Sequence, residues 1–253
     1  MLAKNLMGLG KLFLILAVSG NVYAQSWTQP LNTDWRVVLR LAPGATYLYN
    51  APDAGLLQPL KVTNGVVFPY TPQITVTHTA NYTPQKLTHN NYTNYFYDNS
   101  EVNGITINAE FTVQSIDEGQ YLLATIYFFR SVTKMFFGMD PKAGNPPPIV
   151  YLNGYGQYYL PNVPCVVTSF SHTMPSDVDY MDVPEPFVTA SGYNPQITNR
   201  RMNSTRLPTT STINLTLQPV YSRLAQSQNF SLQDFSKGAL INGSGANGRV
   251  TAF

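Results

Sequence analysis

Histidine, cysteine and acidic side chains are the groups that could carry out chemistry in this chain, and they are few and scattered. The histidines His78, His89 and His172 form no HExxH or HxH pattern, and a single cysteine, Cys165, supplies neither a zinc site of the usual spacing nor an internal disulfide. G-x-S-x-G, P-loop and GxGxxG motifs do not occur. We therefore expect no catalytic residue, no metal site and no cofactor, and we interpret Cys165 as a small buried hydrophobe on a strand.

One acidic group and one pair of arginines remain as candidate polar sites. The acidic group lacks the glycine and the terminal glutamate of an EF-hand loop. We interpret it as a solvated loop or as a surface that pairs with arginine on a neighbouring molecule. The residues are Asp177, Asp179, Asp182 and Glu185, with Arg200 and Arg201 as the candidate basic partners.

The elements that would position these residues are mostly strands. Ile105 to Val113 alternates apolar and polar residues cleanly, and Gln73 to Ala80 places Ile74, Val76 and His78 on one face. Further strands are expected at Trp35–Leu41, Val66–Tyr70, Ile149–Leu152, Gln157–Leu160, Val163–Ser171 and Thr210–Val220, the last with Ile213, Leu215 and Leu217 facing inward.

One helix interrupts this pattern. Ser115 and Glu118 have the spacing of a capping box, and apolar residues follow at helical spacing without Gly or Pro. The sequence predicts a helix over about 117–137. Short strands with one helix and no βαβ alternation predict a mainly β domain, a sandwich or barrel with one packed helix, over residues 31–241.

Long loops connect these elements. Ala42 to Asn64 carries turn signals and is expected to be mostly loop, and Met174 to Pro208 is interpreted as a long connection. Asn81 to Ser100 is rich in Asn, Thr and Tyr with almost no aliphatic residues, so we expect an exposed excursion that meets another molecule. Gln228 to Ile241 is expected to close with a short helix, and residues 242–253 form a Gly- and Asn-rich tail, flexible or bound to a partner.

The first 30 residues read in two ways. Lys4 and Lys11 precede an apolar run that is followed by Val22-Tyr23-Ala24, which fits a secretory signal peptide cleaved after Ala24. The apolar run is too short to span a bilayer as a helix. We expect a retained helical segment that docks on a partner, with the cleaved signal peptide as the alternative.

The composition points to a protein that is covered by partners. Charged residues are 11% of the chain, against roughly 25% in an average globular protein. The 17 Tyr and 13 Phe supply side chains suited to interfaces. A net charge of +2 is far from the balance of a dedicated nucleic-acid binder.

Several sequence segments resemble a known family. The run PPPIVYLNGYGQYYLPNVPC from Pro146, its continuation VVTSFSHTMPSDVDYM, and RLPTTSTINLTLQPVYSR resemble tail tube initiator (tube cap) proteins of the baseplate in contractile-tailed bacteriophages. GVVFPYTPQITVTHTANY, LTHNNYTNYFY and FFRSVTKMFFG are similar to the same group. The resemblance covers roughly Asp34 to Ile241 and rests on segments that are expected to form strands and loops.

The resemblance implies a tail-tube fold and a structural role in the virion, in a protein made in the host cytoplasm. Six copies would form a ring whose strands join into one barrel around a lumen. The ring would sit on the central hub of the baseplate and template the first ring of the tail tube protein. A tape-measure protein or DNA would occupy the lumen.

Carried over to this sequence, the resemblance suggests two sets of contacts. Tube-wall and inter-subunit candidates are Ile74, Val76, His78, Ile105, Ile107, Phe111, Val167, Ser169, Ile213, Leu215 and Leu217. Ring-to-ring candidates are Tyr92, Tyr95, Tyr97, Asp177, Asp179, Arg200 and Arg201.

The alternative is an exported β-sandwich binding module, at the cell surface or in the periplasm, made with a cleaved signal peptide. It predicts a ligand groove lined by exposed Tyr or Trp. Trp27 and Trp35, the only tryptophans, both lie near the start of the chain and give that groove little support.

Overall fold

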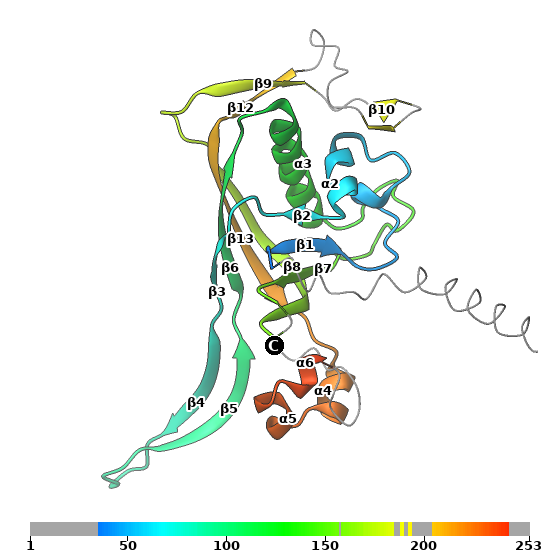
Figure 1. The fold of residues 1–253 in the computed structure, drawn as a ribbon. Coiled ribbons are helices and arrows are strands. Elements are labelled where there is room, and N and C mark those ends of the chain that lie inside the picture. The colour runs from blue at the N-terminus through cyan, green and yellow to red at the C-terminus, as the bar shows by residue number, and fades with distance from the viewer. Residues whose placement is uncertain (1–34, 157, 185–187, 190–191, 194–203, 243–253) are drawn as a thin grey trace, which may run out of the picture. The chain divides into compact units, whose positions relative to one another are not determined.

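The computed structural model describes residues 35–156, 158–184, 188–189, 192–193 and 204–242, which form a mainly β protein of antiparallel sheets (Figure 1). All of them except Trp35 belong to one compact unit, which begins at Arg36. The main sheet has seven strands in the order β2-β1-β7-β8-β13-β6-β3. Their bounds are β1 Val38–Leu41, β2 Val66–Val67, β3 Gln73–Thr75, β6 Ile105–Thr112, β7 Val150–Gly154, β8 Leu160–Thr173 and β13 Thr210–Pro219.

The main sheet is strongly curled, because its two edge strands follow each other along the chain. Residues 68–72 alone connect β2 to β3, and that connection spans at most about 21 Å when fully extended. Seven strands in a flat sheet would separate the two edges by roughly 29 Å. The curl brings Phe68, next to one edge, to a ring-centroid distance of 6.0 Å from Phe111 of β6. The fold is therefore barrel-like, as the predicted sandwich or barrel allowed.

Three two-stranded antiparallel sheets complete the β structure: β4 His78–Gln85 with β5 Asn94–Val102, β9 Tyr180–Pro184 with β12 Ser204–Pro208, and β10 Val188–Thr189 with β11 Gly192–Tyr193. They correct two predictions and show the structure of a third, exposed region. Gln73 to Ala80 is not one strand, because β3 pairs with β6 whereas β4 pairs with β5. The excursion Asn81–Ser100 lies mostly within the β4–β5 hairpin, and the connection Met174–Pro208 contains the paired strands β9 and β12.

The predicted helix is confirmed as α3, Ile116–Val132, and its start follows from the capping box. Ser115 Oγ accepts a hydrogen bond from Glu118 N at 3.3 Å, and Glu118 Oε2 accepts one from Gln114 N at 2.8 Å. The predicted end at residue 137 is wrong. Phe136 N instead donates to Asn145 O, and the Phe136 ring packs edge-on against Tyr47 at 5.2 Å. A tertiary contact therefore ends the helix about one turn early.

The expectation of a single helix was also too simple. The predicted loop Ala42–Asn64 holds η1 Leu48–Asn50, η2 Gly55–Leu57 and α2 Gln58–Thr63. After β13 come α4 Arg223–Asn229, α5 Leu232–Ser236 and α6 Ala239–Asn242, where one short closing helix was expected. All of these helices are short, which is why an apolar pattern at helical spacing did not reveal them.

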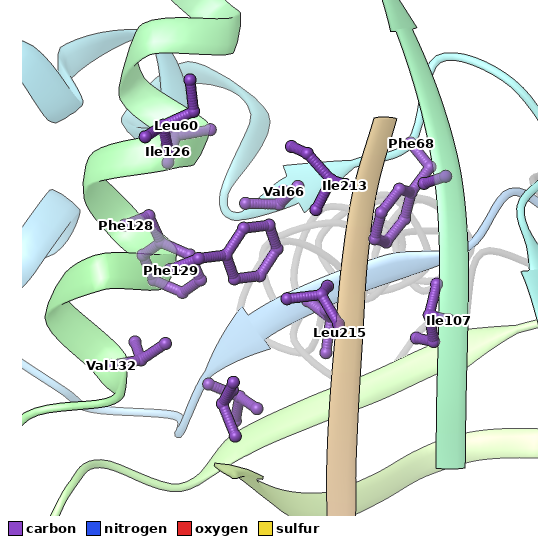
Figure 2. Close-up of a cluster of buried hydrophobic side chains, with 14 of the residues drawn as sticks. Leu60, Val66, Phe68, Ile107, Ile126, Phe128, Phe129, Val132, Ile213 and Leu215 are labelled. Carbon is purple, nitrogen blue, oxygen red and sulfur yellow. The ribbon is translucent and has the colours of Figure 1, made fainter. Parts of the chain in front are cut away.

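One hydrophobic core joins α3 to the sheet, and Figure 2 shows side chains of α3, α2, β2, β6 and β13 meeting in it. The alternation predicted for β6 and β13 is confirmed. The residues of these two strands that lie in the core are Ile105, Ile107, Ala109 and Phe111 of β6, with Ile213, Leu215 and Leu217 of β13. On β6 and β13, one face is therefore committed to the core, and the alternate residues lie on the opposite face.

Substituting alanine for Ser115 is expected to lower the free energy of unfolding by about 1 kcal/mol, because the N-cap hydroxyl satisfies a free backbone N–H of α3. Ser131→Ala is the matched control. Its hydroxyl donates to Tyr127 O within the helix, where the backbone carbonyl already has a partner. Urea unfolding of both variants checks this, and an equal loss of stability in the two would contradict the capping role.

Candidate functional site

The β4–β5 hairpin is the most exposed regular structure among the described residues. Its strands continue β3 and β6 beyond the main sheet (Figure 1), and Gly104 and Asn103 mark the break between β5 and β6. In β5 every residue from Asn94 to Glu101 is exposed. An isolated two-stranded hairpin is marginally stable in water, and its open edges invite pairing with another chain.

Aromatic side chains occupy both faces of this hairpin. Tyr82 lies opposite Tyr97 in the pairing register, with their ring centroids 5.6 Å apart, and Tyr95 lies on the same face because it is two residues from Tyr97. Phe96, between them, points to the other face. These four side chains are each more than half exposed. A hairpin with rings on both faces is suited to insertion between two neighbouring surfaces.

Polar contacts between side chains hold the hairpin in register. Asn81 Nδ2 donates to Asn99 Oδ1 at 2.9 Å and to Glu101 Oε1 at 3.2 Å. Near the main sheet, Asn103 Nδ2 donates to Thr79 Oγ1 at 2.8 Å. A bulge between Asn81 and Tyr82 shifts the register. The hairpin is therefore ordered by hydrogen bonds, while its aromatic area remains available.

A second candidate surface is the face of the main sheet that turns away from the core, which we call the outer face. Cross-strand neighbours there are small and polar: Asn214 lies opposite both Asn108 and Ser171, and Thr216 lies opposite Thr106 and Ser169. Along β3, β6, β13 and the part of β8 beyond its bulge, the outer face comprises Gln73, Thr75, Thr106, Asn108, Glu110, Ser169, Ser171, Thr173, Thr212, Asn214 and Thr216. Glu110 is the one charged residue among these eleven.

Most tube-wall candidates lie in the core of the chain itself. Ile105, Ile107, Phe111, Val167, Ile213, Leu215 and Leu217 are at most 6% exposed. Ile74 and Val76 are half-buried against the same core. The side chains of the seven are thus unavailable to a second subunit, and this residue-level expectation is corrected. The strands that carry them present the outer face instead.

Ser169 and His78 do not share the orientation of those apolar residues. A bulge at Thr168, whose Oγ1 donates to Thr216 O at 3.0 Å, reverses the alternation of β8 after Val167. Ser169 is therefore exposed, and Phe170 turns inward to pack 5.5 Å from the ring of Phe129. His78 is exposed at the start of β4.

The ring-to-ring candidates fall into separate parts of the chain. Tyr95 and Tyr97 lie on β5 and Tyr92 lies in the turn that precedes it, all exposed. Asp177 and Asp179 are exposed in the connection between β8 and β9, where Asp179 O accepts a hydrogen bond from Thr209 N at 2.8 Å. Arg200 and Arg201, the leader 1–30 and all of the tail except Asn242 lie outside the described residues.

The residues that could carry out chemistry form no common site among the described residues either. Cys165 is a fully buried free thiol, as predicted, and burial raises its pKa to about 12, so the thiolate is not formed at neutral pH. Within the described part of the chain, no group of three His, Cys, Asp or Glu residues is arranged to hold a metal ion. The helices described here include none long and apolar enough to span a membrane.

Sequence reasoning missed the strand character of the hairpin. Its aromatic and Thr-rich strands have few aliphatic residues, although aromatic and β-branched residues are themselves a strand signal. Comparisons with models of known protein families and with characterised proteins find no match for this chain.

Proposed function

We propose that the chain is a structural assembly protein whose working form is a closed ring of its own copies. The observation that carries the proposal is the β4–β5 hairpin, which exposes aromatic rings on both faces and two long strand edges. A surface of this kind is an aggregation hazard in a solitary protein and an asset in one that is covered by neighbours. Head-to-tail contacts that rotate back on themselves close such an assembly into a ring.

The family that the sequence resembles suggests which ring this would be. It would be a tail tube initiator ring in the baseplate of a contractile-tailed phage, built in the host cytoplasm and retained in the virion. Six copies would link the central hub to the first ring of tail tube protein. The hairpin supports such a role, since a projecting hairpin can insert between subunits of the next ring.

The outer face suits the wall of a lumen. Its eleven residues over β3, β6, β8 and β13 carry mostly hydroxyl and amide groups, and Glu110 is the one charged residue among them, whereas Arg40 lies on the same face of β1. Phosphate backbones bind proteins chiefly through Lys and Arg, and none of the eleven outer-face residues is either. A wall of this composition would let DNA or a tape-measure protein pass without holding it.

The test is the assembly state of a hairpin variant. The combined substitutions Tyr95→Ser, Phe96→Ser and Tyr97→Ser should weaken self-association at least tenfold, because the loss of each ring removes contact area from the proposed interface. The single-chain fold should persist, because these side chains lie outside the core. Native mass spectrometry and sedimentation velocity over a range of protein concentrations measure the association.

Tyr158→Ser is the matched control, because Tyr158 is similarly exposed at 66% but lies outside the hairpin. It should assemble as the unsubstituted chain does. A ring that survives the triple substitution would refute the role of the hairpin. A monomer whose intact mass shows cleavage after Ala24 would refute the ring and support the exported binding module.

A further inference from the structure

A surface cavity of about 600 Å³, open to solvent, lies between α3, the end of β8 and β12. That volume is within the range of small-ligand sites. Helix α3 contributes Leu123, Ile126, Tyr127 and Arg130, and β12 contributes Arg206 and Leu207. His172 and Met174 complete the wall on the β8 side. The lining thus joins aliphatic side chains to three basic ones.

The basic groups of the cavity are not neutralised within the described residues. The guanidinium of Arg130 lies over the Tyr127 ring at 5.7 Å from its centroid, and neither Arg130 nor Arg206 forms an ion pair with a described carboxylate. Asp182 lies opposite Arg206 in the β9–β12 register but does not line the cavity. The lining therefore carries two exposed arginines and no acidic residue.

His172 adds an unsatisfied polar atom. Its Nε2 is buried beneath the lining and has no hydrogen-bond partner, so a ligand would reach that atom only if the side chain shifts. Burial and the nearby Arg130 lower the pKa of His172, so the ring is neutral at pH 7. An oxyanion beside it would favour the imidazolium and raise that pKa.

We propose that this cavity binds a carboxylate carried on an apolar group. The guanidinium groups would hold the carboxylate near His172, because charged hydrogen bonds are the strong ones. The aliphatic wall would hold the apolar part, as in most small-ligand sites. The site goes beyond the ring proposal and does not depend on it.

The probe is phenylacetate, with phenylacetamide as the uncharged counterpart of the same shape. Phenylacetate should shift the NMR signals of the His172 imidazole along a saturable curve and raise its pKa, whereas the amide should not. His78 and His89 are the only other histidines, and His172→Asn assigns the signals. Equal shifts with acid and amide, or a response that does not saturate, would overturn the proposal.

Matched variants test which positively charged side chains contribute to phenylacetate binding. Arg130→Gln and Arg206→Gln should each weaken phenylacetate binding about tenfold, the effect of one lost charge-assisted hydrogen bond. Lys134→Gln removes an exposed positive charge just beyond the end of α3, outside the cavity lining, and should leave binding unchanged. Equal affinity in Arg130→Gln and Lys134→Gln would show that the cavity charge plays no part.

A free small acid and an acidic side chain of a neighbouring subunit share this chemistry, and self-association separates the two sources. If a neighbouring subunit supplies the carboxylate, Arg130→Gln should weaken self-association, and phenylacetate should compete with it. If the source is a free acid, Arg130→Gln should associate normally while losing phenylacetate. If the chain is monomeric at every concentration, the ring proposal is refuted, and the phenylacetate titration still tests the cavity by itself.

Discussion

Replacing Phe129 by alanine is expected to destabilise the protein by about 3–5 kcal/mol, the usual cost of emptying a large buried aromatic site. Phe129 is fully buried, and its ring centroid lies 5.5 Å from those of Phe128 and Phe170. The residue therefore joins α3 to the inward-facing part of β8 beyond the bulge. Chemical unfolding followed by circular dichroism measures the loss.

Tyr127→Ala on the same helix is the matched control, because Tyr127 is 41% exposed. Its contact with Arg130 is an exposed cation–π pair, so a loss of no more than about 1 kcal/mol is expected. Similar losses at the two positions would mean that α3 is not anchored to the sheet through Phe129.

Replacing Gly65 by alanine should be nearly as damaging. Gly65 follows the left-handed Asn64 at the end of α2 and has a φ of +126°, which costs about 1–3 kcal/mol for a residue with a Cβ. A Cβ placed there would lie 2.5 Å from the carbonyl oxygen of Leu39 in β1. Because that obstacle is backbone in a paired strand, relief requires β1 to shift.

Gly44→Ala separates the two contributions. Gly44 also has a positive φ, +78°, but a Cβ there would meet nothing within 4 Å. Its loss in thermal stability should reflect backbone strain alone, and Gly65→Ala should exceed it clearly. Equal shifts in melting temperature would mean that β1 yields to the added methyl group at little cost.

The spacing of apolar residues in the sequence predicted the elements whose buried positions follow a regular period. Strand β6 alternates without interruption from Ile105 to Phe111 and was predicted correctly, as was the start of α3 at its capping box. The end of α3 could not be predicted, because Phe136 leaves the helix to contact Tyr47, a residue much earlier in the chain. The inward position of Phe170 could not be predicted, because the bulge at Thr168 breaks the period-two pattern of β8.

The candidate surfaces were only partly within reach of the sequence. The hairpin region was expected to be exposed, since Asn81–Ser100 lacks aliphatic residues, and it is. Its strands were missed because they contain few aliphatic residues to mark a buried face. The cavity could not be foreseen, because Leu56, Arg130, His172 and Arg206 meet only in the folded chain.

The curled sheet also sets the order in which a newly made chain can fold. Ile107 of β6 pairs with Leu215 of β13, which is 108 residues later in the chain (215 minus 107). At a synthesis rate of ~5–20 residues per second, β6 waits roughly 5–20 s on the ribosome for that partner. The β4–β5 hairpin needs only local contacts and is translated long before the core that anchors it. Chaperones that shield aromatic segments during translation should therefore raise the yield of this protein.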